Sequence, residues 1–391
     1  MGFIVEVNKG GILLVAIQSV STQKRVTKEA FEEVKHQLSD SSKLILYFAS
    51  TVYDFNELSC LFAQYFPRTE VVGLTTVGEI NKDGFSENSL SALSFSGSEF
   101  KAQAVLMDNI EKYPILYREE LIQAAERVGI DRKSRLIEKQ GLGLVFPNGL
   151  IAAEERMLSI VNSIFPHEGF PLFGGTAGDD AKFVETNVSV NGEVSSKAGA
   201  VVFVKTTDDI QIYKENIFQS TGKQLKITKA NTESRVVYEF NGRKASDEYA
   251  RLLGISESQL THYFMTNPLG RNIDDQIWIA SPFQVNGDGS IQFYCQLFQD
   301  SIVEILEPKK VVETVRASIR HFKEGFAHLE GVLAVNCILR KLQFQNQKLT
   351  TDLNREMSQL PNLSGFSSYG EQLNKTQLNQ TMILLGFGKR K

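Results

Sequence analysis

Three stretches of the chain combine glycine, a hydroxyl residue and an acid, which are residue types that contact polar ligands from loops. They occupy residues 73–79, 173–180 and 365–371. Glycine allows positive φ angles and close backbone approach, while hydroxyl and carboxylate oxygens supply polar contacts. From these stretches we predict a set of ligand contacts: Thr75, Thr76, Glu79, Thr176, Asp179, Ser367, Tyr369 and Glu371. The structural alternative is that they are tight turns whose side chains bond local backbone amides.

The charge of these stretches favours an amine-bearing ligand over a phosphate. A phosphate-binding loop would carry a basic residue beside its glycines, whereas acids follow the glycines here. Arg340 comes directly after a strongly apolar segment. It is predicted either as the partner of one of the turn acids or as an anchor for an anionic group of the ligand.

A hydrolase that uses Thr176 as its nucleophile is the enzymatic alternative. Residues 174–178 fit the pattern G-x-[ST]-x-G, and His167 and Asp179 are near in the sequence. In such an elbow, however, the base normally comes from a distant loop, threonine replaces serine poorly, and the other two stretches lack the spacing. The sequence also has no Walker loop, no Rossmann fingerprint in context and no HExxH helix. We therefore predict a protein that is not an enzyme.

The same order of elements precedes each of the three stretches. An apolar strand, an amphipathic helix ended by proline and a second strand are predicted at 44–74, at 142–175 and at 332–364. Such a strand–helix–strand unit places its turn at the carboxyl end of the second strand, where α/β sheets bind ligands. The pattern predicts an α/β fold with mixed sheets built from repeated units, helices packed on the sheets, and antiparallel hairpins between the units.

The hairpins and the domain boundary are predicted from turn residues and polarity. Asn-Gly at 191–192 is expected to join strands 184–190 and 199–204, with further hairpins at 241–242 and 286–289. Residues 206–222 are polar and have no clear pattern. We therefore predict two related domains, at 1–205 and 206–391.

The composition restricts the class of protein. A net charge of -4 without a basic run argues against nucleic-acid binding. The longest apolar run, 12–17, is too short to span a membrane, and no signal peptide is visible. Three scattered cysteines indicate neither a disulfide framework nor a zinc knuckle. A cytoplasmic protein, with a homodimer as one expected state, is predicted.

In order along the chain, several motifs resemble the FIST family of intracellular sensory proteins, over both its N-terminal and C-terminal domains. The N-terminal motifs are residues 73–80, 145–150, 173–180 and 199–204. The C-terminal motifs are residues 237–242, 267–270, 336–340, 365–371 and 378–381. On this resemblance the predicted domains are a FIST N-like and a FIST C-like domain, and Asn148 and Asn267 join the predicted ligand contacts.

The resemblance implies a small-ligand sensor that acts on a separate histidine kinase or cyclic-di-nucleotide enzyme. Some stand-alone members of similar length are haem proteins that respond to nitric oxide, and this chain looks like one of them. The alternative that the resemblance leaves open is a sensor of an amino acid or similar metabolite without haem. A scaffold that binds no ligand is a third hypothesis.

A haem would need an axial ligand, most often histidine. His36, His321 and His328 are predicted on polar faces of helices, the last two on one helix at 311–329. His262 is the first choice, because alternation in a predicted strand at 260–265 places it on an apolar face. His167, in the loop before the second stretch, is the second choice. A hydrogen-bonded core histidine is the structural alternative for His262.

Overall fold

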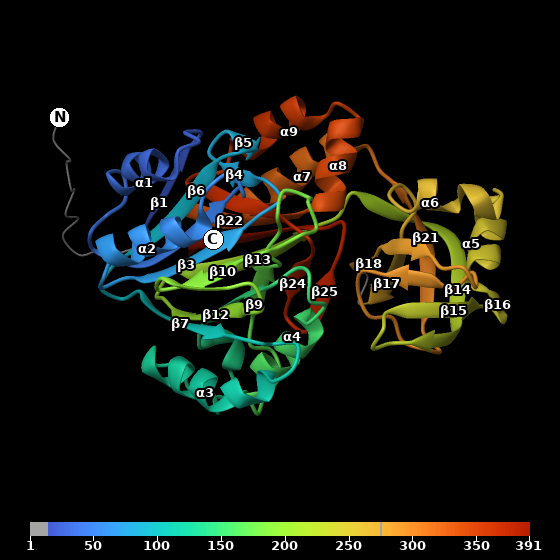
Figure 1. Ribbon diagram of the computed structural model, residues 1–391, viewed down its shortest axis with the longest axis horizontal. Coiled ribbons are helices and arrows are strands. Elements are labelled where there is room, and N and C mark those ends of the chain that lie inside the picture. Colours follow the sequence, from blue (N-terminus) through green and yellow to red (C-terminus); the bar gives the residue numbers. More distant parts are fainter. Residues whose placement is uncertain (1–14, 274–275) are drawn as a thin grey trace.

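A computed structural model describes residues 15–273 and 276–391 of the chain (Figure 1). It contains one body built from three units and a smaller β-rich domain inserted into the third unit. Each unit repeats one order of elements: a strand, a helix, a second strand, one or two helices, a third strand, a two-stranded hairpin and a last strand. The predicted repetition of strand–helix–strand units is confirmed, and the repeat is larger than predicted.

The first unit contains the following elements: β1 Ala16–Thr22, α1 Thr27–Lys35, β2 Ser42–Ala49, α2 Phe55–Tyr65, β3 Glu70–Thr75, β4 Glu79–Asn81, β5 Gly84–Ser86 and β6 Leu90–Ser96. The second contains β7 Lys101–Met107, α3 Arg118–Arg127, β8 Leu142–Pro147, α4 Glu154–Ser163, β9 Leu172–Gly175, β10 Val188–Val190, β11 Glu193–Ser195 and β12 Gly199–Lys205. Short 3₁₀ helices lie at Pro114–Tyr117 and Ile137–Lys139.

The third unit is interrupted after its first strand. Its elements are β13 Asp209–Glu215, α7 Val311–Glu324, β22 Phe326–Cys337, α8 Ile338–Asn346, α9 Thr350–Met357, β23 Leu363–Ser368, β24 Glu371–Leu373, β25 Thr376–Leu378 and β26 Met382–Arg390. The inserted domain lies between β13 and α7. It contains β14 Phe218–Asn231, β15 Val236–Phe240, β16 Arg243–Lys244, α5 Ala245–Leu253, a 3₁₀ helix Glu257–Gln259, α6 Leu260–Tyr263, β17 Leu269–Ile273, β18 Gln276–Ala280, β19 Pro282–Val285, β20 Ile291–Phe293 and β21 Ile302–Pro308.

The three units exchange their hairpins in a cycle. The first sheet has the order β1-β6-β2-β3-β10-β11, so its last two strands belong to the second unit. In the same way β24 and β25 of the third unit extend the sheet of the second, and β4 and β5 of the first extend the sheet of the third. The second unit therefore completes the sheet of the first, the third completes that of the second, and the first completes that of the third, so the three units interlock.

The centre of the body is a single apolar core shared by all three units. Phe366 of β23 stacks on Phe48 of β2 at 4.8 Å between ring centroids and lies 6.3 Å from Phe146 of β8. All three side chains are buried. Strands β2 and β8 and the second half of β22, from Gly331 on, are covered on both faces, which explains their apolar runs. At the start of α2, the side chain of Asp54 accepts the Glu57 amide at 2.9 Å, as an N-cap does.

The inserted domain has its own eight-stranded sheet and its own core, with Tyr249 and Phe240 in edge-to-face contact. It projects from one side of the body (Figure 1). The α/β fold class predicted from the sequence is confirmed.

Several predicted elements were wrong in detail. The 191–192 turn joins β10 to β11, whereas β12 lies in a different sheet. Residues 206–222 contain β13 and the start of β14. β13 is the edge strand of its sheet and most of its side chains are half-buried, which is consistent with its polar sequence. The helix predicted at 311–329 ends at Glu324, and His328 lies in β22. The helix predicted from about residue 341 to residue 357 is two helices, and residues 260–263 are helical instead of extended. The domain boundary at residue 206 stays a prediction.

Candidate functional site

The three glycine-rich turns meet in space and are hydrogen-bonded to one another in a ring. The amide of Gly178 donates to the carbonyl of Thr75 at 2.9 Å, which joins the second turn to the first. Thr176 donates to the carbonyl of Gly370 at 2.9 Å, and Val77 donates to that of Ser367 at 3.0 Å. The structure therefore brings together the eight turn residues predicted from the sequence, and seven of them are buried. Tyr369 is partly exposed.

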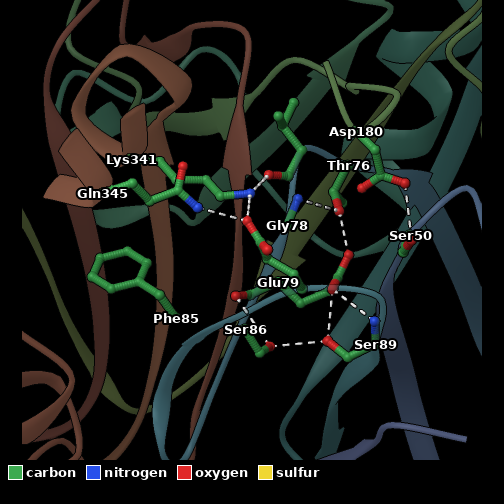
Figure 2. Close-up of polar contacts among 12 residues, drawn as sticks. Ser50, Thr76, Gly78, Glu79, Phe85, Ser86, Ser89, Asp180, Lys341 and Gln345 are labelled. Atoms are coloured by element: carbon green, nitrogen blue, oxygen red, sulfur yellow. Dashed lines mark hydrogen bonds and ion pairs between the residues drawn. The ribbon is translucent and has the colours of Figure 1, made fainter. Parts of the chain in front are cut away.

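The first turn is organised around the buried carboxyl group of Glu79 (Figure 2). The hydroxyl of Thr76 donates to its Oε1 at 2.6 Å, and the amide and hydroxyl of Ser89 donate to Oε2 at 3.1 and 2.6 Å. Burial raises the pKa of Glu79 to about 7, against the effect of these hydrogen bonds. The acid ties the turn to the start of β6.

Helix α8 of the third unit also holds the first turn. The amino group of Lys341 donates to the carbonyl of Val77 at 2.6 Å and pairs with Glu87 at 2.7 Å. Figure 2 shows Lys341 beside Gly78 of the turn. The hydrogen bond from Lys341 lowers the pKa of Glu87. A cavity of about 270 Å³ opens beside this ion pair, between Phe85 and Phe344. Because the ion pair already satisfies Lys341, the pair mainly fixes the two units to each other.

The third turn repeats the first. Glu371 is fully buried and begins β24, as Glu79 begins β4. Its carboxyl group accepts the hydroxyl of Ser368 at 2.9 Å and the amide of Thr381 at 3.3 Å. Burial raises the pKa of Glu371 to about 8. In both turns a hydroxyl three residues earlier and an amide before the last strand bind the acid.

The second turn differs, although its residue types are the same. Val188 begins β10, and the acid Asp179 lies on an intervening loop. Asp179 accepts the backbone amides of Phe183, Val184 and Glu185 at 2.6–3.0 Å, and also the hydroxyl of Tyr369. This carboxylate therefore fixes the loop, in which three non-glycine residues have positive φ angles: Asp180, Ala181 and Phe183.

Arg340 lies near the start of α8 and is completely buried. Its guanidinium pairs with Glu215 of β13, not with one of the turn acids, and its Nε donates to Asn336 at 2.9 Å. It also lies over the Phe344 ring, 5.2 Å from the centroid. Arg340 thus has a carboxylate partner, but the partner is Glu215 and not one of the turn acids that were predicted.

The two asparagines predicted from the family motifs lie apart. Asn148 is buried at the end of β8, where its amide donates to the carbonyls of Thr186 and Ser196 at 2.9 and 2.8 Å. It thereby holds both ends of the segment that contains β10 and β11. Asn267 lies in the inserted domain and donates to the Leu306 carbonyl at 3.0 Å. The structure does not bring Asn267 to the turns.

His262 is not in the setting that was predicted for it. It lies on the short helix α6, and its side chain is exposed, so the predicted strand and apolar face were both wrong. A capping box formed by Ser256 and Gln259 starts this helical segment, and that pattern is visible in the sequence. His36, His321 and His328 are exposed, as predicted.

His167 lines a cleft of about 550 Å³ between the body and the inserted domain. One wall is α4 and the loop after it, where Phe165 and Phe170 stack at 4.0 Å. The hairpin β24–β25 contributes Lys375 and Gln377, and the inserted domain contributes Arg271, Gln296 and Phe298. The sequence analysis missed these last residues, because four segments far apart in the chain supply the lining.

The charges of the cleft are of both signs. Glu155 and Glu168 line it together with Arg271 and Lys375. The Nε atom of Arg271 is buried and has no hydrogen-bond partner among the described residues. A buried donor without a partner is costly, so an acceptor from a ligand would stabilise it. Such a cleft can bind a small molecule that carries both an anionic and a cationic group beside an apolar part.

A buried ion pair joins the two walls of the cleft. Arg235 of the inserted domain pairs with Glu154 of α4 at 2.6 Å and also with Glu155, and it donates to the Tyr294 carbonyl at 2.9 Å. Burial raises the pKa of Glu154, and the guanidinium opposes this rise. Because Glu155 also lines the cleft, the ion pair connects the cleft to the contact between the body and the inserted domain.

The histidines were tested as sites for a haem. His262 does not fit one, because its exposed position on α6 offers no apolar enclosure. His167 is exposed as well, but it lines the cleft beside Phe165 and Phe170, so it is the better placed of the two. Among the residues that the structure describes, no group of three His, Cys, Asp or Glu side chains is arranged to hold a metal ion. No helix in this part of the chain is long and apolar enough to cross a membrane.

Comparisons with known proteins identify two family models in the chain. The FIST N domain matches residues 43–243, and the FIST C domain matches residues 245–374. No curated protein matches the sequence. Among solved structures, PurLQS from Thermotoga maritima is similar at 9% identity and a TM-score of 0.19, over 96% of this chain and 73% of that chain. A TM-score this low carries no argument about the fold or the function.

Proposed function

Because the chain belongs to the FIST family, whose domains are associated with small-ligand sensing in signal transduction, we propose that it senses a small ligand in the cleft between the body and the inserted domain. The observation that carries this proposal is Arg271, whose side chain lines the cleft and whose buried Nε has no hydrogen-bond partner among the described residues. A carboxylate of the ligand would accept from it.

An amino acid or a similar metabolite has the chemistry that this cleft would recognise. Its carboxylate would bind Arg271, its ammonium group would face Glu155 or Glu168, and its side chain would contact Phe298. Ligand bound here would touch both walls of the cleft and would therefore favour one arrangement of the walls over others. The ion pair of Arg235 joins these two walls, so it is the first contact that such a change would affect.

A panel of amino acids in a thermal-shift assay tests this proposal. A ligand at about 100 times its Kd should stabilise the native state by about 2.7 kcal/mol and raise Tm. We expect Arg271→Met to abolish the rise and Arg243→Met, at an exposed position of the same domain, to keep it. An equal rise in both variants would place the ligand elsewhere.

A haem-based sensor of nitric oxide is the second candidate, and the position of His167 in the cleft favours it over a site at His262. His167 would hold the iron, and the haem would supply the gas-binding centre. After incubation with haemin, we expect a Soret band that His167→Ala weakens and His262→Ala leaves unchanged. Absence of the band in the unaltered protein would eliminate this candidate.

Signal output is proposed to pass to a separate cytoplasmic histidine kinase or cyclic-di-nucleotide enzyme, without catalysis by this chain. The Thr176 hydroxyl is buried and faces the Gly370 carbonyl at 3.4 Å, a poor position for a nucleophile. We expect the partner's activity to differ between addition of the ligand-bound protein and addition of the ligand-free protein. An esterase activity lost in Thr176→Val would instead support the hydrolase alternative.

A further inference from the structure

Lys214 occupies a second cavity, which is separate from the cleft. The cavity has a volume of about 480 Å³ and lies between β13, the loop before β9 and strand β18 of the inserted domain. The two sites share no lining residue: on the β24–β25 hairpin, Leu373 and Asn374 line this cavity, whereas Lys375 and Gln377 line the cleft. A ligand in one site would therefore not occupy the other.

The alternation of β13 arranges the interior of this cavity. Ile210, Ile212 and Lys214 are spaced two residues apart, so their side chains share one face of the strand. β13 and β18 are the edge strands of their two sheets. Trp278 of β18 covers the face that the isoleucines present, and Leu373 adds to the apolar wall. The result is a cavity of mixed polarity, with an apolar wall of Ile210, Ile212 and Trp278 beside the amino group of Lys214.

The amino group of Lys214 is held in place by two contacts with β18. It donates to the Ile277 carbonyl at 2.9 Å and lies 3.9 Å from the centroid of the Trp278 ring. The indole face stabilises a cation at this distance. An ammonium group has three N–H donors, and one bond to a carbonyl uses a single one. The remaining donors can accommodate an anionic acceptor.

The charge balance of the cavity indicates which ligand would fit. Burial lowers the pKa of Lys214 to about 8, because the partly desolvated ammonium is disfavoured. Among the described lining residues the other ionisable side chains are Glu138, which is exposed at the rim, and the phenol of Tyr213. No described carboxylate forms an ion pair with Lys214, so a carboxylate brought by a ligand would supply the counter-charge.

We propose that this cavity binds a small monocarboxylate with an apolar body. The carboxylate pairs with the ammonium group of Lys214, and the apolar body packs against Ile210, Ile212 and the indole of Trp278. The site is independent of the ligand proposed for the cleft.

The single tryptophan of the chain makes the proposal directly testable, because all indole fluorescence comes from Trp278. Hexanoate is the probe, and hexanamide is an uncharged probe of the same length. Sodium chloride at matched ionic strength controls for screening. We expect a saturable change in fluorescence with hexanoate. The dissociation constant for hexanamide should be at least about tenfold larger.

Variants of Lys214 separate charge from packing. Lys214→Met keeps most of the side-chain volume and should weaken hexanoate binding at least about tenfold, whereas Lys214→Arg keeps the charge and should bind within about threefold of the unaltered protein. Lys226→Met removes an exposed lysine of the inserted domain, away from the cavity, and should leave hexanoate binding unchanged.

Three outcomes would overturn the proposal: no saturable response to hexanoate, equal affinity for hexanamide, or full affinity in Lys214→Met. If Lys214→Met does not fold, as judged by circular dichroism, the comparison of the two probes on the unaltered protein decides the question alone.

Discussion

The first and third turns use their acids differently from the second turn. Glu79 and Glu371 are buried at the start of a hairpin and are held mainly by hydroxyl groups, with pKa values raised by burial. Asp179 lies on an added loop and is held by three backbone amides. The three stretches look alike in sequence, yet two keep an acid at the same structural position and one has moved it to serve the loop.

The length of the segment between turn and hairpin accounts for this difference. Glu79 and Glu371 follow directly on their turns, whereas β10 begins nine residues after Asp179, at Val188. The longer loop has backbone amides that need acceptors, and the nearest acid supplies them. The same residue types can therefore have different roles, depending on the length of the segment between the turn and the hairpin. Four predictions test this comparison, from the largest expected effect to the smallest.

The first prediction concerns pH and the two raised carboxyl groups. Folding raises the pKa of Glu79 from 4.5 to about 7, so the folded state keeps a proton that the unfolded state loses. The stability from this proton is complete below pH 4.5 and is lost as the pH rises through about 7. At about 1.4 kcal/mol per pKa unit, the loss is about 3 kcal/mol. Urea unfolding at several pH values measures it.

The variant Glu79→Gln should reduce this loss, because its amide resembles the protonated acid and does not titrate. Glu371→Gln should do the same over a range that extends to about pH 8. Glu185→Gln, at an exposed acid on the loop of the second turn, is the matched control and should leave the pH dependence unchanged. If Glu79→Gln kept the full pH dependence, the buried acids would not be its source.

Second, Asp179→Ala should destabilise the protein by about 2 kcal/mol, because several loop amides lose their acceptor. Hydrogen exchange should show faster exchange at the amides of Phe183 and Val184. Unchanged protection there would show that the loop does not depend on Asp179.

Third, the matched hydroxyls of the first and third turns should have matched effects. Thr76→Val and Ser368→Ala each remove a hydrogen bond to a buried acid and should cost about 1.5 kcal/mol. Thr176→Val, at the second turn, should cost less, because its hydroxyl is 3.4 Å from its acceptor. Chemical denaturation of the three variants would rank them, and an equal cost for all would remove the distinction between the turns.

Fourth, Tyr369→Phe should have the smallest effect, at about 1 kcal/mol or less. It removes the hydroxyl that binds Asp179 but keeps the ring, which stacks on Phe183 at 5.0 Å between centroids. Tyr369→Ala, which removes both contacts, should cost more. A cost for the phenylalanine variant as large as that of Asp179→Ala would mean that the hydroxyl, not the loop amides, carries the role of Asp179.

Much of the secondary structure could be predicted because it depends on neighbours in the sequence. The apolar runs at β2, β8 and β22 and the prolines that end α2 and α4 are local signals, and their predictions were confirmed in type. The failure at His262 was also local: the capping box at Ser256 outweighs the alternation of four residues in so short a segment. The capping box predicts a helix that contains His262.

The site could be predicted only in part. The turn residues were found, because glycine, hydroxyl and acid leave a recognisable pattern. The lining of the cleft was not found, since Arg271, Lys375 and Phe298 have ordinary neighbours and come together only across the contact between the body and the inserted domain. The same holds for Lys214 and Trp278, which are 64 residues apart in the sequence but lie 3.9 Å from each other.

The sequence by itself determined the units, their turns and the family, because strand, helix and turn signals act over a few residues. Only the tertiary structure decided that the hairpins are exchanged in a cycle and that the second acid serves a loop. Any strand edge offers the same backbone donors and acceptors, so a sequence does not state which distant edge a hairpin will join. Packing of the shared core around Phe48, Phe146 and Phe366 makes that choice.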